Sequence, residues 1–287
     1  MDIKFSVITP AFNAADFIED AIQSVLDQRY PYIEHIVIDG GSNDGTVDIL
    51  KKYDHLKWRS EPDKGQSHAI NKGFDISSGN IIGILNADDF YIPEIFSYIA
   101  EEFRSEDDFL VGKVKVLLEN GSQWINDPKI KYEDMLYHWL PDAYPVNPAG
   151  YFFRKEVFIY SGWMNEKSHN TMDLEFLLNA ARKFDFRKVD KIFGVFRNFE
   201  NTKTQIKQKK GENWTIDNFF FIEEHLKNFS FDFRKKFRED REAGYQMRKL
   251  QQLFQYYEEE IKRDDKAFLF KLNDYLNLAY LKYVKKL

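Results

Sequence analysis

The chain has 287 residues, a formal net charge of −6, 43% hydrophobic residues and no cysteine. This length accommodates one large domain with an appendage, and the apolar content is enough for a buried core. The composition excludes disulfides and zinc–thiolate centres, and no apolar run approaches the roughly 20 residues of a membrane-spanning helix.

Two short apolar stretches, residues 5–10 and 33–38, predict buried strands near the N-terminus. A third apolar stretch runs directly into the adjacent carboxylates of Asp88 and Asp89. Helical patterns separate the strands, and this alternation predicts an α/β fold with a doubly wound, mainly parallel sheet flanked by helices. Ligands of such sheets bind beyond the carboxyl ends of the strands. Three polar residues fall at such ends, namely Thr9, Asp39 and Asp88.

The helix predicted between the first two strands has one apolar face. Apolar residues from Phe17 to Leu26 recur at spacings of three and four, with Asn13 and Asp16 before them as candidate N-caps. A further helix is expected from Gln66 onward, where the same spacing returns.

The pair of carboxylates at Asp88 and Asp89 suggests a cation site. Hard divalent ions are held by carboxylate oxygens, and Mg²⁺ or Mn²⁺ commonly joins one or two protein carboxylates to the phosphates of a nucleotide. The alternative is a solvated turn after a strand. The neighbouring motifs favour the cation site.

Four motifs, in this order, resemble those of the family-2 glycosyltransferases of the GT-A fold. They are SVITPAFN at residues 6–13, DGGSNDGT at 39–46, EPDKGQ at 61–66 and NADD at 86–89. The resemblance implies a GT-A catalytic domain over residues 1–205. Its nucleotide-sugar-binding half would extend to about residue 105, and its acceptor half would cover about 106–205.

The resemblance also implies roles for individual residues. In that family the first two motifs hold the nucleotide base, the region that corresponds to Asp88 holds the ribose, and the last Asp of the fourth motif binds the metal. The base would thus be surrounded by Thr9, Pro10, Phe12 and Asp39. The ribose would lie at Asn86, Ala87 and Asp88, and Mn²⁺ or Mg²⁺ at Asp89. Lys64 is a candidate phosphate contact, with an exposed turn lysine as the alternative.

Physical chemistry supports these assignments independently of the family. The edge of uracil offers an N–H group that the Asp39 carboxylate can accept, and Phe12 has a ring that can stack on the base. A ribose has two hydroxyl donors for a carboxylate. The diphosphate leaving group accumulates negative charge, which a bound metal offsets most in the transition state.

Some positions depart from the commoner family pattern. Asn86 stands where Asp is more frequent, which weakens a metal role for that residue. Phe199 stands where a His often follows an Arg such as Arg197, and a phenyl ring cannot ligate a metal. His68, near a helix start, either meets a phosphate or sugar hydroxyl or serves as a capping group.

The catalytic candidate lies in the second half of the chain. Residues 162–178 look like the acceptor-side element of the family, in which an acidic residue at a helix start acts as general base, and Asp173 matches that residue. Its alternative role is that of an N-cap or first-turn carboxylate. Glu175 is the second candidate base, although it projects to a different side of the helix. Arg154 and Arg197 are candidates for contacting the diphosphate or the acceptor.

The C-terminal region, residues 206–287, is predicted to be helical. Apolar stripes over residues 250–261 and 268–283 indicate two amphipathic helices, and basic residues outnumber acidic ones from residue 203 onward. Docking on the catalytic domain or a homo-oligomer is one interpretation, and peripheral contact with anionic lipid at the inner face of the membrane is the other. Because no signal-peptide pattern precedes the first strand, a cytoplasmic location is expected.

The sequence thus predicts an inverting, metal-dependent glycosyltransferase of surface polysaccharide synthesis. It would move a sugar from a nucleoside diphosphate donor, with UDP expected, to a glycan or lipid-linked acceptor. The alternative is a catalytically silent nucleotide-sugar or glycan-binding protein on the same fold. A nucleotidyltransferase would need a basic triphosphate loop after the first strand, and a dehydrogenase would need a glycine-rich one. The acidic ligand face argues against nucleic acid as a partner.

Overall fold

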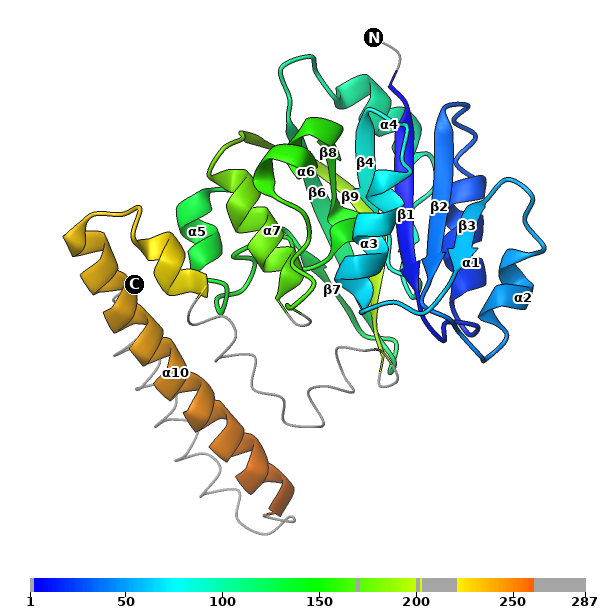
Figure 1. Cartoon of the computed structure of the whole chain (residues 1–287). Coiled ribbons are helices and arrows are strands. Elements are labelled where there is room, and N and C mark those ends of the chain that lie inside the picture. Colours follow the sequence, from blue (N-terminus) through cyan, green and yellow to red (C-terminus); the bar gives the residue numbers. More distant parts are fainter. Residues whose placement is uncertain (1–2, 169–170, 200–201, 203–220, 261–287) are drawn as a thin grey trace. The chain divides into compact units, whose positions relative to one another are not determined.

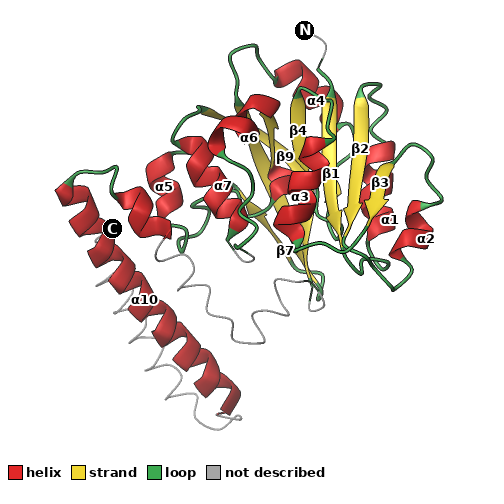
Figure 2. Ribbon diagram, viewed as in Figure 1, coloured by secondary structure: helices red, strands yellow, loops and turns green. Residues whose placement is uncertain are grey.

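The computed structural model describes residues 3–168, 171–199, 202 and 221–260, with side chains described up to residue 245. The chain divides into two units, Met1–Phe221 and Ile222–Leu287. The described part of the first unit is built on a nine-stranded sheet flanked by helices (Figures 1 and 2).

The N-terminal half of the sheet is entirely parallel. Its strands lie in the order β3-β2-β1-β4. They are β1 (Phe5–Ala11), β2 (Ile33–Asp39), β3 (Lys57–Ser60) and β4 (Ile81–Ile84). The helices between them are α1 (Ile18–Leu26), α2 (Thr46–Leu50) and α3 (Gln66–Asp75). This half therefore has the predicted alternation of strands and helices.

The second half adds antiparallel pairs to the sheet. β8 runs antiparallel to both β4 and β6, whereas β6 and β9 are parallel to each other. The strands are β5 (Phe90–Tyr91), β6 (Phe109–Leu118), β7 (Gln123–Asn126), β8 (Tyr151–Arg154) and β9 (Phe186–Asn198). The helices are α4 (Ile95–Glu102), α5 (Tyr132–Leu136), the 3₁₀ turn η1 (Pro148–Gly150), α6 (Lys155–Ser161) and α7 (Met172–Ala181).

Both faces of β1, β2 and β4 are buried, which explains why these three strands are almost continuously apolar. On one face, Ile18 and Ile22 of α1 pack with Val37 of β2 in one hydrophobic cluster. On the other, α3 lies so close to the sheet that a Cβ at Gly73 would stand 2.4 Å from Cγ2 of Ile8. Only glycine permits that approach without displacing the isoleucine.

The predicted N-caps of α1 are wrong. The N-cap position is Phe17, which makes no side-chain capping hydrogen bond. Asn13 instead adopts a left-handed backbone conformation with φ of 47°, and its Oδ1 accepts a hydrogen bond from the backbone N of Asn43 at 3.1 Å. Asn13 is therefore used to join two loops, a role that the local sequence pattern does not reveal. Leu26, counted in the apolar face, is 46% exposed.

Glu34 is a buried carboxylate of β2 that links three segments. It accepts hydrogen bonds from Ser6, Lys57 and Ser78. Burial alone would raise the pKa of Glu34, but the hydrogen bonds from Lys57, Ser6 and Ser78 outweigh burial and lower this pKa to about 2. The ionised carboxylate therefore stabilises the folded state.

We expect Glu34→Gln to lower the free energy of unfolding by about 2 kcal/mol at pH 7. Because the folded-state pKa is depressed, this contribution is fully present above the unfolded-state pKa of about 4.3 and is lost as the pH falls toward about 2. Urea unfolding at pH 7 and pH 3 measures it. Equal pH dependence in the wild type and the variant would contradict this account.

The described part of the second unit is helical, as predicted for the C-terminal region. α10 (Phe231–Glu260) has 30 residues, and residues 222–226 form a preceding helical segment. Glu223 of that segment accepts hydrogen bonds from Arg238 at 2.6 Å and Arg241 at 3.0 Å. The predicted stripe over residues 268–283 and the predicted boundary after residue 205 lie outside the described residues. Within the described chain, no helix is both apolar and long enough to span a bilayer.

Candidate active site

The carboxyl ends of β1, β2 and β4 meet at one edge of the sheet, toward which the arrowheads of β1 and β2 point in Figure 2. The parallel register sets Ala11 opposite Asp39 and Ile8 opposite Ile84. As a result, Thr9, Asp39 and the turn that follows β4 lie at the same edge, where the strand ends predicted them.

Asp39 is fully buried and organises the loop after β2. Its Oδ2 accepts hydrogen bonds from the backbone N of Gly41 at 3.1 Å, the backbone N of Ser42 at 3.0 Å and Ser60 Oγ at 2.6 Å. Its Oδ1 accepts from the hydroxyl of Ser42. The carboxylate thus shapes the loop after β2.

The end of β1 has two buried predicted residues and one exposed ring. Thr9 and Pro10 are buried, and Thr9 Oγ1 lies 2.8 Å from Nε2 of His35. Burial, together with nearby His55, lowers the pKa of His35 to about 3, so the imidazole is neutral. Phe12, in contrast, is 65% exposed. Of the side chains predicted around the base, only the Phe12 ring is open to solvent.

The turn after β4 presents its two carboxylates differently. Asp88 is partly exposed, whereas Asp89 has 0% exposure. Oδ2 of Asp89 accepts from Asn86 Nδ2 at 3.0 Å and Asn147 Nδ2 at 2.7 Å, and Oδ1 accepts from the backbone N of Arg197 at 2.9 Å. Burial and the charge of Asp88 raise the pKa of Asp89 well above its ordinary value. These contacts differ from the open position expected for a metal ligand.

The first turn of α3 contacts both halves of the candidate site. Gln66 Nε2 donates to Asn86 Oδ1 at 2.8 Å, and Ser67 Oγ donates to Sδ of Met172 at 2.8 Å. Met172 precedes Asp173 at the start of α7. The neighbouring residues Gln66 and Ser67 therefore connect the turn with Asp88 to the helix with Asp173.

Lys64 lies on the rim of this arrangement. Its Nζ is 3.2 Å from a carboxylate oxygen of Glu166, and its side chain is 72% exposed. His68 Nδ1 accepts a hydrogen bond from the backbone N of Lys64 at 3.1 Å. This bond, next to the start of α3, corresponds to the capping alternative for His68. The lysine thus bridges the loop before α3 and the loop before α7.

Asp173 occupies the first turn of α7, whose N-cap is Thr171. The capping alternative for Asp173 is therefore reduced to a first-turn carboxylate stabilised by the helix dipole. Burial and the charge of Asp173 raise the pKa of Tyr144 to about 12. Glu175 is engaged elsewhere, because its oxygens accept from Asn165 Nδ2 at 2.9 Å and Thr171 Oγ1 at 3.2 Å.

Arg197 contacts Asp89 in the turn after β4 with its backbone N, whereas its guanidinium makes other contacts. The guanidinium carbon lies 4.7 Å from the ring centroid of Phe90 and 5.7 Å from that of Phe17, and the group pairs with Asp20. Phe199 packs edge-on against the same Phe17 ring, with centroids 6.3 Å apart. These contacts direct the guanidinium toward α1 and β5.

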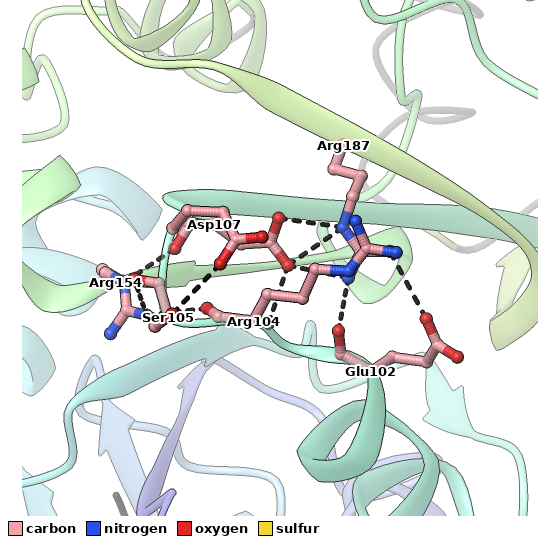
Figure 3. A network of polar contacts seen from close by, with 7 residues as sticks. Glu102, Arg104, Ser105, Asp107, Arg154 and Arg187 are labelled. Carbon is pink, nitrogen blue, oxygen red and sulfur yellow. Dashed lines mark hydrogen bonds and ion pairs between the residues drawn. The ribbon is translucent and has the colours of Figure 1, made fainter.

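Arg154 lies at the opposite edge of the sheet, so its predicted contact with the diphosphate or acceptor is wrong. Because β8 is antiparallel to β4, Arg154 pairs with Ile81 at the start of β4. It donates to the carbonyl oxygens of Asp107 at 2.6 Å, Arg104 at 2.9 Å and Ser105 at 3.0 Å (Figure 3).

Arg187 holds the same loop from β9. Its Nε lies 2.8 and 2.9 Å from the two oxygens of Asp107, and its Nη1 lies 3.3 Å from Glu102 (Figure 3). The network of Figure 3 therefore stabilises the edge of the sheet opposite to the candidate site.

Asn147 is a residue of the site that the sequence analysis missed. It is 2% exposed, donates to Asp89, and caps η1 by accepting from the backbone N of Ala149 at 2.9 Å. Its local signal was an asparagine followed by Pro148, which is typical of a helix start. That signal predicts the cap but not the bond to Asp89, which lies 58 positions away in the chain.

The described residues contain no group of three or more His, Cys, Asp or Glu side chains suited to form a metal centre by themselves. The partly exposed Asp88 nevertheless fits Mg²⁺ or Mn²⁺, because these ions commonly take one or two carboxylates and complete their coordination with phosphate and water. A site of that kind needs no protein cage.

Known proteins similar to this chain are glycosyltransferases. TuaG of Bacillus subtilis (strain 168), provisionally assigned to teichuronic acid biosynthesis, is 43% identical over 89 residues, which cover 29% of this chain and 35% of TuaG. The uncharacterized glycosyltransferase alr2836 of Nostoc sp. is 34% identical over 171 residues, covering 54% of this chain and 52% of that protein. The chain therefore spans about a third to half the length of these relatives.

A solved structure and a family model extend the comparison. The crystal structure of S. aureus TarS 1-349 in complex with UDP-GlcNAc matches with a TM-score of 0.61 and 17% identity, over 96% of this chain and 81% of that chain. The likeness confirms the predicted GT-A class of fold. The family model described as "Glycosyl transferase family 2" matches residues 6–162. Since this match covers more than half of the sequence, the chain belongs to glycosyl transferase family 2.

Proposed function

We propose that this chain transfers a sugar from a UDP-linked donor to a glycan or lipid-linked acceptor, in a metal-dependent reaction that inverts the anomeric carbon. Family membership supports a nucleotide-sugar transferase. The TarS structures that contain UDP or UDP-GlcNAc support UDP as the donor nucleotide. Relatives named for teichuronic acid biosynthesis and chondroitin synthesis support a polysaccharide product.

The observation that carries this proposal is the contact of α3 with both halves of the site. Through Gln66 and Ser67, one helical turn touches Asn86 and Met172. A donor bound at the turn after β4 would thus lie close to Asp173. Holding two reactants in such a relation converts a bimolecular step into an effectively unimolecular one.

On the donor side, Asp39 would accept the N–H of uracil, and the exposed ring of Phe12 would pack on the base. Lys64 would leave its exposed ion pair with Glu166 and bind a phosphate oxygen instead. This change costs little, because an exposed ion pair contributes little stability. Asp88, rather than the enclosed Asp89, would hold Mn²⁺ or Mg²⁺. When bound, such an ion offsets the charge that develops on the diphosphate leaving group.

On the acceptor side, Asp173 would remove the proton of the attacking hydroxyl. The start of α7 thus presents a carboxylate, the kind of group that can accept a proton as a general base. Attack from the side opposite the diphosphate gives a single displacement and hence inversion. Glu175 would support the loop before α7, since its oxygens already hold Asn165 and Thr171.

A donor panel tests the proposal. With Mn²⁺ present, UDP and one UDP-sugar are expected to raise the melting temperature and to be hydrolysed slowly without acceptor, because ligands that bind only the folded state stabilise it. GDP-, CMP- and dTDP-sugars serve as matched controls. An NMR assignment of the product anomer tests inversion. Binding without hydrolysis or transfer would indicate a silent binding protein, and no nucleotide binding at all would contradict the proposal.

The C-terminal region would bring the enzyme to its acceptor from the cytoplasmic side. The supporting pattern is the set of aromatic residues beside Lys282, Lys285 and Lys286, typical of a surface that contacts anionic lipid. Sedimentation with phosphatidylglycerol vesicles, compared with phosphatidylcholine vesicles, measures membrane contact. Sizing of the protein measures oligomerisation, the other role considered for this region.

A further inference from the structure

The carboxylate of Asp89 joins three parts of the first unit that are distant in the sequence. Its donors are Asn86 in the turn after β4, Asn147 at the start of η1 and the backbone N of Arg197 in β9. With 0% exposure and both oxygens accepting, this side chain is placed to fix the relative positions of those segments. Its neighbour Asp88, on the same turn, is partly exposed.

Asn147 is held firmly enough to act as an anchor for Asp89. Its own Oδ1 accepts from the backbone N of Ala149, so both ends of the amide are bonded. η1 in turn lies tightly against β9, because a Cβ at Gly194 would stand 2.8 Å from Cβ of Ala149. The amide of Asn147 therefore has little freedom to rotate or shift.

Arg197 supplies a second rigid donor. Its guanidinium is enclosed by the rings of Phe17 and Phe90 and is paired with Asp20. These contacts fix the residue whose backbone N bonds Asp89 Oδ1. Asp89 is thus oriented from outside its own turn.

We propose that Asn147 is a positioning residue for the metal site: through Asp89 it fixes the turn that presents Asp88 to the ion and the diphosphate. The inference rests on the proposed function, because it requires Asp88 to meet a nucleotide-bound cation. Groups that orient a metal ligand typically contribute 10- to 100-fold in metal affinity or activity. Asn147 lies in the acceptor half of the domain. A residue of the acceptor half would therefore fix the position of the metal ligand in the donor half.

The test is a UDP titration of Asn147→Ser with EDTA and at increasing Mn²⁺. Serine keeps the N-cap of η1 but is too short to reach Asp89. We expect UDP affinity without metal to stay within about two-fold of wild type, and the Mn²⁺ concentration for half-maximal enhancement to rise about 10- to 100-fold. If Asn147 only stabilised the fold, Asn147→Ser would weaken UDP binding to the same extent with and without Mn²⁺.

The matched control is Asn80→Ser. Asn80 is a partly buried asparagine directly before β4, at the edge of the sheet opposite to the candidate site, and its Oδ1 accepts from the backbone N of Lys4 at 2.8 Å. The Mn²⁺ response of this variant should equal that of wild type.

A second variant keeps the inference testable if Asn147→Ser folds poorly. Asn147→Asp keeps the acceptor that caps η1 but removes the donor to Asp89, and it should also raise the Mn²⁺ concentration for half-maximal enhancement about 10- to 100-fold. A folded Asn147→Ser or Asn147→Asp protein with a wild-type Mn²⁺ response would overturn this inference alone. Absence of UDP binding by the wild-type protein would overturn the proposed function and, with it, this inference.

Discussion

Asp173→Asn is expected to lower the rate of sugar transfer by at least about 100-fold, because an amide cannot accept the proton of the acceptor hydroxyl. Folding and UDP affinity should remain close to normal. The substitution keeps the shape of the side chain, and the N-cap of α7 is Thr171 rather than Asp173. Transfer assays with saturating donor, together with thermal unfolding and UDP titration, separate catalysis from structure.

Glu175→Gln is the matched control for this prediction. Glu175 lies two residues further along α7, and its oxygens hold Asn165 and Thr171. A glutamine keeps an acceptor for at least one of these bonds, so transfer should stay within a few-fold of wild type. A slow Glu175→Gln enzyme beside a nearly normal Asp173→Asn enzyme would assign the general base to Glu175.

Asp88→Asn is expected to abolish the enhancement of UDP binding by Mn²⁺ and to lower transfer at least about 100-fold, since metal stabilisation of a leaving group amounts to several kcal/mol. Binding of UDP in EDTA should change little, because the base contacts are elsewhere. Titration of UDP with and without Mn²⁺ measures both effects. An unchanged metal dependence in Asp88→Asn would remove this residue as the ligand.

Asp39→Asn provides the comparison, because it alters the proposed base contact and leaves the turn after β4 intact. Weaker UDP binding is expected to the same extent with and without Mn²⁺, by about 10-fold, as is typical when a hydrogen bond to a charged group is lost. The asparagine keeps one acceptor oxygen for the loop donors that Asp39 binds. A metal-dependent defect in this variant would place Asp39 at the phosphates.

The placement of Thr9, Asp39 and Asp88 at one edge was predictable from the sequence, and the reason is general. Parallel strands end on the same side of the sheet, so residues that follow successive strands are brought together whatever the intervening loops. The prediction required only that the strands be identified, and their apolar composition identified them.

The orientation of side chains within the turn was not predictable in the same way. Asp88 and Asp89 are adjacent in the sequence, yet one is partly exposed and the other has 0% exposure. The difference comes from Asn147 and Arg197, which approach Asp89 from distant parts of the chain. The local sequence pattern contains no information on contacts with distant residues. The motif therefore predicts where the two carboxylates lie but not which of them is partly exposed to solvent.

Strand direction limited the prediction for Arg154. The apolar stretch that becomes β8 reads the same whether it runs parallel or antiparallel to its neighbours. Its antiparallel pairing with β4 carries Arg154 to Ile81, at the edge opposite to Asp88. Arg197, on the longer strand β9, reaches the candidate site because that strand continues to Asn198 alongside β6.

Because Gly73 of α3 lies so close to Ile8 of β1, a substitution at one of these positions constrains the residue at the other. With only 2.4 Å available for a Cβ, a larger residue at position 73 would have to be accompanied by a smaller one at position 8. Chimeras that import α3 or β1 alone from a homologue would separate residues selected to fit each other. Because α3 also begins with Gln66 and Ser67, donor preference is best transplanted with β1 and α3 as one block.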